Sequence, residues 1–242
     1  MKNTMRKNTI FSLCLMLIVQ HCLAQSDTIL TRYKQYLTTN LKVPPNSRQL
    51  AATLNSNGQW SDINYRDNEK SNWQPLIHLK RVRDLALAWS DQRSSFYQQN
   101  ATFQASSLAL DHWLEKRYKC PNWWHNEIGV PQQMRDIIIL LKTKLSPQQL
   151  KGALEVFAQY KANTNLTGAN LSWSADLGIH YGALTGDLEL IRKNRDLVIQ
   201  EIRITTRDGV QPDYSFHQHD KRLQMYQYGE AFLSQNIRLA HH

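Results

Sequence analysis

The chain has 242 residues, of which 20% are charged and 41% hydrophobic, and its formal net charge at pH 7 is +9. The sequence has no lysine-rich run, so the charge gives little support to nucleic-acid binding. A modest positive excess suits an acidic polymer in general, because the field of a cationic cleft raises the local concentration of any anion.

The first 24 residues have the features of a signal peptide. Three basic residues precede an apolar run over 10–19, and the segment ends in the small residue Ala24, which suits signal peptidase. An apolar run of about ten residues is too short to cross a bilayer as a helix. We therefore expect 1–24 to be removed and 25–242 to be secreted or periplasmic, without membrane attachment. A lipoprotein acylated at Cys22 fits less well, because the residues before it are not small.

Cleavage would also change the cysteine count and the charge. Cys14 and Cys22 leave with the signal peptide, and Cys120 alone cannot form an intramolecular disulfide. Three cations and no acidic residue are lost, so the net charge falls to +6. An exported protein without disulfides depends on its hydrophobic core, which a chain of this length can supply. We expect the mature protein to be a monomer.

Most of the mature chain carries apolar residues at helical spacing. Helices are expected over about 26–39, 73–89, 105–118, 131–145, 146–162, 170–184, 187–202 and 222–239. Ser146 and Gln149 form a capping-box pattern around Pro147. Residues 50–72 are irregular, and no segment alternates convincingly with period two, so no substantial sheet is expected. The sequence predicts an all-α domain of paired antiparallel helices, either a bundle or a ring.

The stretch at 122–129 reads NWWHNEIG, and we interpret it as a loop before a helix. Trp123 and Trp124 are adjacent, so they cannot both face the core from one helical stripe. Indole rings pack against the C–H faces of sugars, and Asn122 and His125 can hydrogen-bond to hydroxyl groups. Aromatic packing in the core is an alternative of equal weight.

Asn170 falls at the start of an expected helix, within the stretch NLTGANLS at 165–172. Asn is among the best N-cap residues, so an N-cap is the plain interpretation. Its carboxamide can also meet an anionic group, because exposed amide donors and the helix dipole favour negative charge there. The two roles do not exclude each other.

The segment 213–229 reads DYSFHQHDKRLQMYQYG, which is too polar and aromatic for a core strand. If the end of this segment is helical, Tyr228 lies on the helix and His219 in the loop before it, so the imidazole can approach the phenol. Such a pair suits proton transfer. An ordinary hydrogen-bonded loop is one alternative. A metal site of His217, His219 and Asp220 is another, but it lacks a third imidazole or a thiolate cluster.

Together these stretches resemble polysaccharide lyase family 8, which contains chondroitin AC lyase, hyaluronate lyase and xanthan lyase. The resemblance lies in NWWHNEIG followed by Pro131, then TGAN, then DYSFHQH with Tyr228 nine residues after His219. GQWSDINY at 58–65 is similar to an early motif of the family. The resemblance covers essentially the whole mature chain.

What this resemblance implies is an incomplete (α/α) toroid with a long cleft. Members of the family cleave uronate-containing glycosaminoglycans such as chondroitin and hyaluronan by β-elimination, which leaves unsaturated uronate ends. The expected partner is therefore an acidic polysaccharide. The resemblance implies no metal and no organic cofactor.

The resemblance also implies a role for each matching residue. Asn170 matches the asparagine that neutralises the uronate carboxylate, and His219 matches the catalytic histidine. Tyr228 matches the tyrosine that removes the C5 proton, protonates the leaving O4, or does both. The aromatic patch that orients the sugars and its hydrogen-bonding neighbours match Trp123, Trp124, Asn122 and His125.

The sequence departs from the family pattern after Tyr228. Family members have a further arginine and a glutamate and then β-sandwich domains, whereas this sequence stops at His242 and its Arg238 is not in the arginine motif. A truncated, non-catalytic polysaccharide-binding fragment is therefore an alternative. A weaker one is an α/α-barrel glycoside hydrolase, which needs two carboxylates. Glu127 and Asp176 are available but lie in no recognisable hydrolase motif.

Overall fold

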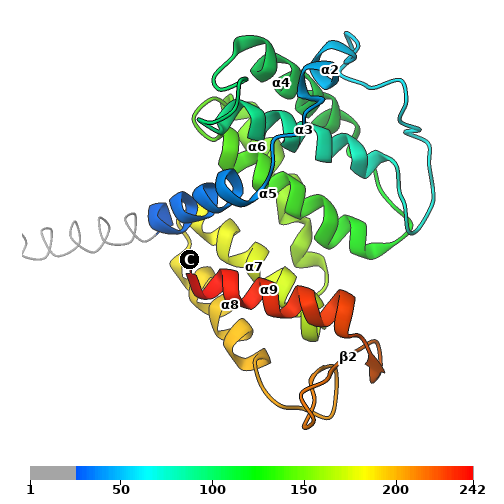
Figure 1. Cartoon of the computed structure of the whole chain (residues 1–242), viewed down its shortest axis with the longest axis vertical. Helices are drawn as coiled ribbons and strands as arrows, with labels where there is room; N and C mark the ends of the chain where they lie inside the picture. Colours follow the sequence, from blue (N-terminus) through cyan, green and yellow to red (C-terminus); the bar gives the residue numbers. More distant parts are fainter. Residues whose placement is uncertain (1–25, 242) are drawn as a thin grey trace, which may run out of the picture.

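The computed structural model describes residues 26–241, so the predicted signal peptide at 1–24 lies outside the described residues. Helices make up most of this part of the chain, and the expected all-α class is confirmed. In Figure 1, α2, α3 and α4 lie toward one end of the molecule and α7, α8 and α9 toward the other, and the first helix lies between these groups. No helix between residues 26 and 241 is both long and apolar enough to cross a membrane.

Most predicted helices are present, with ends shifted by a few residues. A first helix covers 26–40. The elements after it are α2 (Ser47–Ala52), α3 (Pro75–Ser90), α4 (Asn100–Lys116), the π-helix η1 (His125–Gly129), α5 (Val130–Leu141), α6 (Pro147–Phe157), the 3₁₀ helix η2 (Ala158–Ala162), α7 (Gly168–Thr185), α8 (Leu188–Glu201), β1 (Gly209–Val210), β2 (Phe216–Gln218), β3 (Arg222–Leu223), the π-helix η3 (Met225–Gly229) and α9 (Glu230–His241). The sequence does not predict α2, which is only six residues long.

The capping box expected at the start of α6 is confirmed. Ser146 Oγ accepts a hydrogen bond from the Gln149 N–H, and Gln149 Oε1 accepts one from the Ser146 N–H. Each side chain therefore satisfies a backbone donor that the first turn of a helix leaves unpaired.

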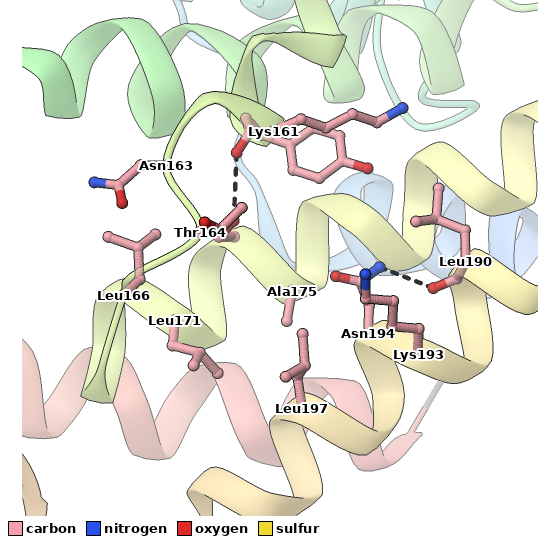
Figure 2. A pocket seen from close by; sticks show the side chains of 12 residues that line it. Lys161, Asn163, Thr164, Leu166, Leu171, Ala175, Leu190, Lys193, Asn194 and Leu197 are labelled. Carbon is pink, nitrogen blue, oxygen red and sulfur yellow. Dashed lines mark hydrogen bonds between the residues drawn. The ribbon is translucent and has the colours of Figure 1, made fainter.

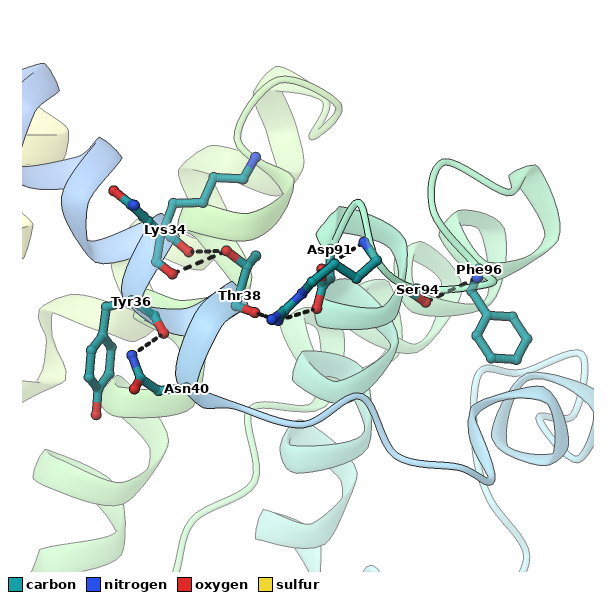
Figure 3. A network of polar contacts seen from close by, with 9 residues as sticks. Lys34, Tyr36, Thr38, Asn40, Asp91, Ser94 and Phe96 are labelled. Carbon is teal, nitrogen blue, oxygen red and sulfur yellow. Dashed lines mark hydrogen bonds and ion pairs between the residues drawn. The ribbon is translucent and has the colours of Figure 1, made fainter.

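The helix over 26–40 is attached to the body near its C-terminal end and near its middle. Arg93 donates a hydrogen bond to the backbone oxygen of Thr38, and the carboxylate of Asp91 holds the Arg93 guanidinium at 2.9 Å. Figure 3 shows this network between the end of the helix and the loop after α3. Near the middle of the helix, Arg32 Nη1 donates to the backbone oxygen of His241, at 3.2 Å. The first and last helices of the described chain therefore touch.

α7 is buried on most of its sides and packs against both α8 and α9. Apolar or small residues all round a helix are typical of one that is enclosed by neighbours. A Cβ atom on Gly178 would lie only 2.3 Å from the Asn194 carboxamide of α8. Glycine at this position therefore permits the close approach of the two helices.

Three short antiparallel strands separate α8 from η3, in the order β1, β2, β3. The prediction of one continuous last helix from Arg222 is wrong, because Arg222 lies in β3 and α9 begins only at Glu230. Strands of two or three residues cannot show the alternation by which strands are predicted. Phe216 of β2 packs with Ala169 of α7 and Phe232 of α9 in a small separate core cluster.

A buried ionic network joins the N-terminal helix, α5, α7 and α9. Asp176 Oδ2 of α7 accepts hydrogen bonds from Arg135 of α5 and from Arg238 of α9, the latter at 2.8 Å. Arg135 Nε also contacts Asp136 Oδ1 at 2.9 Å, and the Tyr33 hydroxyl donates to the same oxygen at 2.9 Å. Arg238 therefore has a structural role in this chain, because it docks α9 on α7.

We expect Asp176→Ala to destabilise the protein by about 3–5 kcal/mol, because it leaves two buried guanidinium groups without this carboxylate. Burial opposes ionisation of Asp176, yet Arg238 and Arg135 outweigh it and hold the pKa of this carboxyl well below its usual value. The contribution to stability is therefore present above the unfolded pKa of about 4 and is lost as the pH falls through the lower folded pKa. Urea unfolding as a function of pH measures it.

The matched control is Asp196→Ala. Asp196 pairs with Arg195 at 2.7 Å on the surface, where both side chains are exposed, so its loss should cost less than about 1 kcal/mol. If Asp176→Ala and Asp196→Ala lowered the free energy of unfolding equally, the stabilising role of the buried network would be contradicted.

Candidate functional site

A cavity of about 450 Å³ lies where the segment before α5, the start of α7 and the end of η3 come together. All seven residues to which the family resemblance gives a role line it. These are Asn122, Trp123, Trp124, His125, Asn170, His219 and Tyr228. Lys70, Ser71, Trp173 and Gln227 complete the lining. Segments about a hundred residues apart in sequence therefore form one site.

The tryptophan segment begins a helix. The interpretation of 122–129 as a loop is wrong, because residues 123–129 are helical and 125–129 form the π-helix η1 that runs into α5. Trp123 keeps 38% of its surface exposed, whereas Trp124 is partly buried and packs edge-on against Trp173, with ring centroids 5.8 Å apart. Both indoles border the cavity, one more open to solvent than the other.

Asn122 and His125 bind the loop that forms one edge of the cavity. Asn122 Nδ2 and His125 Nε2 both contact the backbone oxygen of Lys70, at 3.0 and 3.1 Å. Because a carbonyl only accepts, His125 Nε2 carries a proton in this contact. Asn122 Oδ1 accepts a hydrogen bond from the Trp124 N–H at 3.0 Å. The polar groups of these two residues therefore hold the loop at residues 70–71 against the tryptophans.

Asn170 is the third residue of α7, and Thr167 is the N-cap, so the plain N-cap interpretation of Asn170 is wrong. The side chain is 6% exposed, and its Oδ1 has no hydrogen-bond partner among residues 26–241. A buried carboxamide with an unsatisfied oxygen costs free energy. In the cavity wall, this oxygen can accept a hydrogen bond from a ligand, and only Nδ2 can donate one.

The first two backbone N–H groups of α7 are already used. Gly168 donates to Glu201 Oε1 and Ala169 donates to Gln218 Oε1, the latter at 3.0 Å. These are the groups that usually bind an anion at a helix N-terminus. These two amides are therefore not available to an anion, whereas the Asn170 carboxamide, whose Nδ2 is a donor, borders the cavity.

His219 and Tyr228 are paired as expected. His219 Nε2 lies 2.7 Å from the Tyr228 hydroxyl, and the two rings are perpendicular with centroids 4.8 Å apart. Tyr228 also contacts Trp173, with ring centroids 5.8 Å apart. Burial raises the pKa of Tyr228 above its usual value, so the phenol keeps its proton at neutral pH and can donate it to the imidazole.

None of the described residues that line the cavity is acidic, and its basic residues are Lys70, His125 and His219. Glu127 and Asp176 do not line it, which leaves the hydrolase interpretation without its pair of carboxylates. Within residues 26–241, no group of three or more His, Cys, Asp or Glu side chains could hold a metal ion. The arrangement therefore favours an anionic ligand and proton transfer.

The model of polysaccharide lyase family 8, N-terminal alpha-helical domain, matches residues 18–241. The chain belongs to this family. Chondroitinase-AC of Pedobacter heparinus is 31% identical over 196 residues, which are 78% of this chain and 28% of that enzyme. Hyaluronate lyase of Thermasporomyces composti is 28% identical over 208 residues, 83% of this chain and 25% of the relative.

Solved structures of the family have the same helical fold. A chondroitinase AC lyase, studied as enzyme–oligosaccharide complexes, superposes with a TM-score of 0.78 at 28% identity over 89% of this chain and 32% of its own. Chondroitin AC lyase of Streptomyces coelicolor has a TM-score of 0.77 at 20% identity, a likeness of fold. The expected α/α toroid class is thus confirmed. This family 8 chain spans about a quarter to a third of the length of these relatives.

Four residues that line the cavity were not among the sequence-based candidates. Trp173 lies three residues after Asn170 on α7, so the helical period could have placed it on the same face. Gln227 directly precedes Tyr228 in η3. Lys70 and Ser71 lie in an irregular loop, and nothing in the local sequence predicts that this loop reaches the tryptophans.

A second cavity of about 460 Å³ lies on another side of α7, between the loop before α7 and α8 (Figure 2). It is lined mainly by leucines and uncharged polar side chains and contains none of the residues predicted from the sequence. Leu171 and Ala175 of α7 border this cavity, whereas Asn170 and Trp173 border the first. α7 therefore separates the two cavities.

We expect Tyr228 to titrate above the usual value of about 10, because its ring is partly removed from water. Trp173→Ala should lower this pKa toward the usual value, since it uncovers one face of the phenol. Tyrosine labelled with ¹³C at Cζ and followed by NMR measures both midpoints, and Tyr228→Phe assigns the signal.

Trp123→Ala is the control, because Trp123 lines the same cavity and has no ring contact with Tyr228 among the described contacts. It should leave the Tyr228 midpoint unchanged. A parent midpoint at or below 10 would mean that burial does not set the protonation state of Tyr228.

Proposed function

We propose that this chain is the helical part of an exported lyase that cleaves acidic, uronate-containing polysaccharides by β-elimination. The observation that carries the proposal is the meeting of Asn170, His219 and Tyr228 beside a tryptophan wall in one cavity without acidic residues. Relatives named chondroitinase-AC and hyaluronate lyase support chondroitin and hyaluronan as the first substrates to test. Relatives also include a xanthan lyase, so a xanthan-like polymer comes next.

In this proposal Asn170 makes the C5 proton of the uronate acidic enough to remove. Abstraction of that proton places a second negative charge beside the carboxylate. Hydrogen bonds from the Asn170 carboxamide draw charge from the carboxylate and stabilise the enolate-like intermediate. A preorganised donor of this kind contributes about 3–4 kcal/mol to the stability of a transition state.

His219 and Tyr228 carry the two proton transfers. One proton leaves C5, and one is given to the O4 oxygen of the departing sugar. The phenol begins in its protonated form, because its pKa is raised. If Tyr228 removes the C5 proton, its own proton must first pass to His219 Nε2, which lies 2.7 Å away. If His219 removes it instead, Tyr228 can protonate O4 directly.

The tryptophans hold the sugar chain against this machinery. Trp123 offers an exposed indole face, and Trp124 extends through Trp173 to Tyr228 as a series of contacting rings. Aromatic faces bind the C–H faces of sugars, and the absence of carboxylates from the described lining avoids repulsion of the uronate. The scheme uses no metal and no organic cofactor.

We place the reaction outside the cytoplasm. The segment 1–24 would direct export, and 25–242 would act in the periplasm or the medium as a monomer on its polymeric substrate. The net charge of the mature segment, +6, favours encounter with a polyanion.

We expect the purified chain to raise the ultraviolet absorbance of chondroitin or hyaluronan solutions with time, because β-elimination creates a conjugated unsaturated uronate. Tyr228→Phe should abolish the rise, and Asn170→Ala should slow it by about 10²–10³-fold. Tyr226→Phe is the matched control: Tyr226 is 89% exposed, lies two residues away, and does not line the cavity.

Each of the other possible results would support a different function or remove an assigned role. Saturated reducing ends without an absorbance rise would show hydrolysis. Binding of the polymer without cleavage would show a polysaccharide-binding module, and equal loss in the Tyr226 and Tyr228 variants would remove the assigned role of Tyr228.

A further inference from the structure

The loop that carries His219 has an unusual backbone. Its three residues, His219, Asp220 and Lys221, all have positive φ, at 57°, 61° and 66°. Single His and Asp residues tolerate this region better than most, but three in succession cost free energy that the surrounding structure must offset. The flanking strands have only three and two residues, too few to hold a hairpin by themselves. The loop therefore depends on contacts outside the hairpin.

Gln218 makes such contacts. It is 2% exposed and directly precedes His219. Its Oε1 accepts a hydrogen bond from the Ala169 N–H at 3.0 Å, and its Nε2 donates to the Thr167 oxygen at 3.3 Å and to Asp208 Oδ2 at 2.9 Å. Both ends of the buried carboxamide are thus satisfied.

The partners of Gln218 lie next to Asn170. Thr167 is the N-cap of α7, and Ala169 is the residue just before Asn170. One side chain therefore joins the residue before His219 to the residue before Asn170, across a sequence separation of 49. Gln218 therefore links the two segments that carry the groups required by the proposed elimination.

The surroundings of Gln218 are shaped to receive it. Gly168 has φ +56°, and a Cβ atom there would lie 2.2 Å from Gln218 Oε1, so only glycine leaves room for the carboxamide. Asp208 Oδ2 also accepts from Thr167 Oγ1 at 3.0 Å, and its Oδ1 accepts from the Asp220 N–H at 3.2 Å. Asp208 therefore fixes both the α7 start and the strained loop.

We propose that Gln218 is a positioning residue that sets the separation of the Asn170 carboxamide from the His219–Tyr228 pair. This inference rests on the proposed elimination. The carboxylate and the C5 proton belong to neighbouring atoms of one sugar ring, so both protein groups must reach that ring together. A misplacement of about 1 Å in such an arrangement costs on the order of 100-fold in rate.

The test is Gln218→Met, which keeps the length of the side chain and removes its hydrogen bonds. We expect kcat on chondroitin to fall at least about tenfold while KM changes by less than about threefold. The control is Gln211→Met. Gln211 is also buried, and its Nε2 donates to the Arg207 and Gly209 oxygens without touching α7, so kcat should stay near the parent value.

A double-mutant cycle with Asn170→Ala distinguishes positioning from general damage. If Gln218 acts by placing Asn170 relative to the pair, the double variant should lose little more than Asn170→Ala alone. If the fold-loss in kcat of the double variant equals the product of the two single fold-losses, the proposal is overturned. An unchanged kcat in Gln218→Met would also overturn it.

A second variant covers the case in which Gln218→Met does not fold. Gln218→Glu can still accept from Ala169 but cannot donate to Thr167, and it faces the carboxylate of Asp208. A protonated glutamate regains one donor, so the activity of this variant relative to the parent should rise as the pH falls. A ratio that stays flat with pH would contradict the role of the donated hydrogen bonds.

Affinity for a chondroitin tetrasaccharide, measured by calorimetry on the same variants, separates this inference from the proposed function. A parent that binds without cleaving refutes the lyase activity, and coupling between Gln218 and Asn170 in affinity would then still support positioning. If the effects of the Gln218 and Asn170 substitutions on the binding free energy were additive, the positioning role of Gln218 would be overturned. A parent that neither binds nor cleaves would overturn both proposals.

Discussion

The start of α7 is the constraint on which the rest of the site depends. A helix begins with backbone N–H groups that have no partner within the helix. Here Gly168 donates to Glu201 at the end of α8, and Ala169 donates to Gln218 in the hairpin. The same hydrogen bonds cap α7 and fix two later segments against it. They also leave the Asn170 carboxamide, with its unpartnered oxygen, as the polar group that faces the cavity.

Two π-helices shape the remaining walls. η1 contains His125 and follows the tryptophans, and η3 contains Gln227 and Tyr228. Each ends in a glycine and continues directly into an α-helix, α5 or α9. A π-turn spreads one turn over an extra residue, which re-aims side chains relative to the following helix, and such turns are frequent at functional sites. Trp123, Trp124 and Tyr228 therefore lie beside or within π-turns, where the backbone departs from the regular period.

The sequence predicts the helices well where they are long, as in α3, α7 and α8. The seven candidate residues come from three separate stretches that resemble one family in the same order, and all seven line one cavity. The sequence does not predict the small sheet, since strands of two or three residues carry no pattern. Nor does it predict that Asn122 and His125 bind the Lys70 carbonyl, because a loop contact across about fifty residues depends on tertiary structure.

Tyr228 is held in place through α7 from two directions. On one side, Gln224 in the turn before η3 donates from its backbone N–H to the Phe216 oxygen at 2.9 Å, and β2 is tied to the start of α7 through Gln218. On the other side, η3 continues into α9, which Arg238 docks on Asp176 of the same α7. Tyr228 lies between these two attachments. Both are made to α7, so α7 fixes the position of Tyr228 relative to Asn170. α7 therefore does more than carry one site residue: it is the common reference for the carboxamide and for the proton-transfer pair.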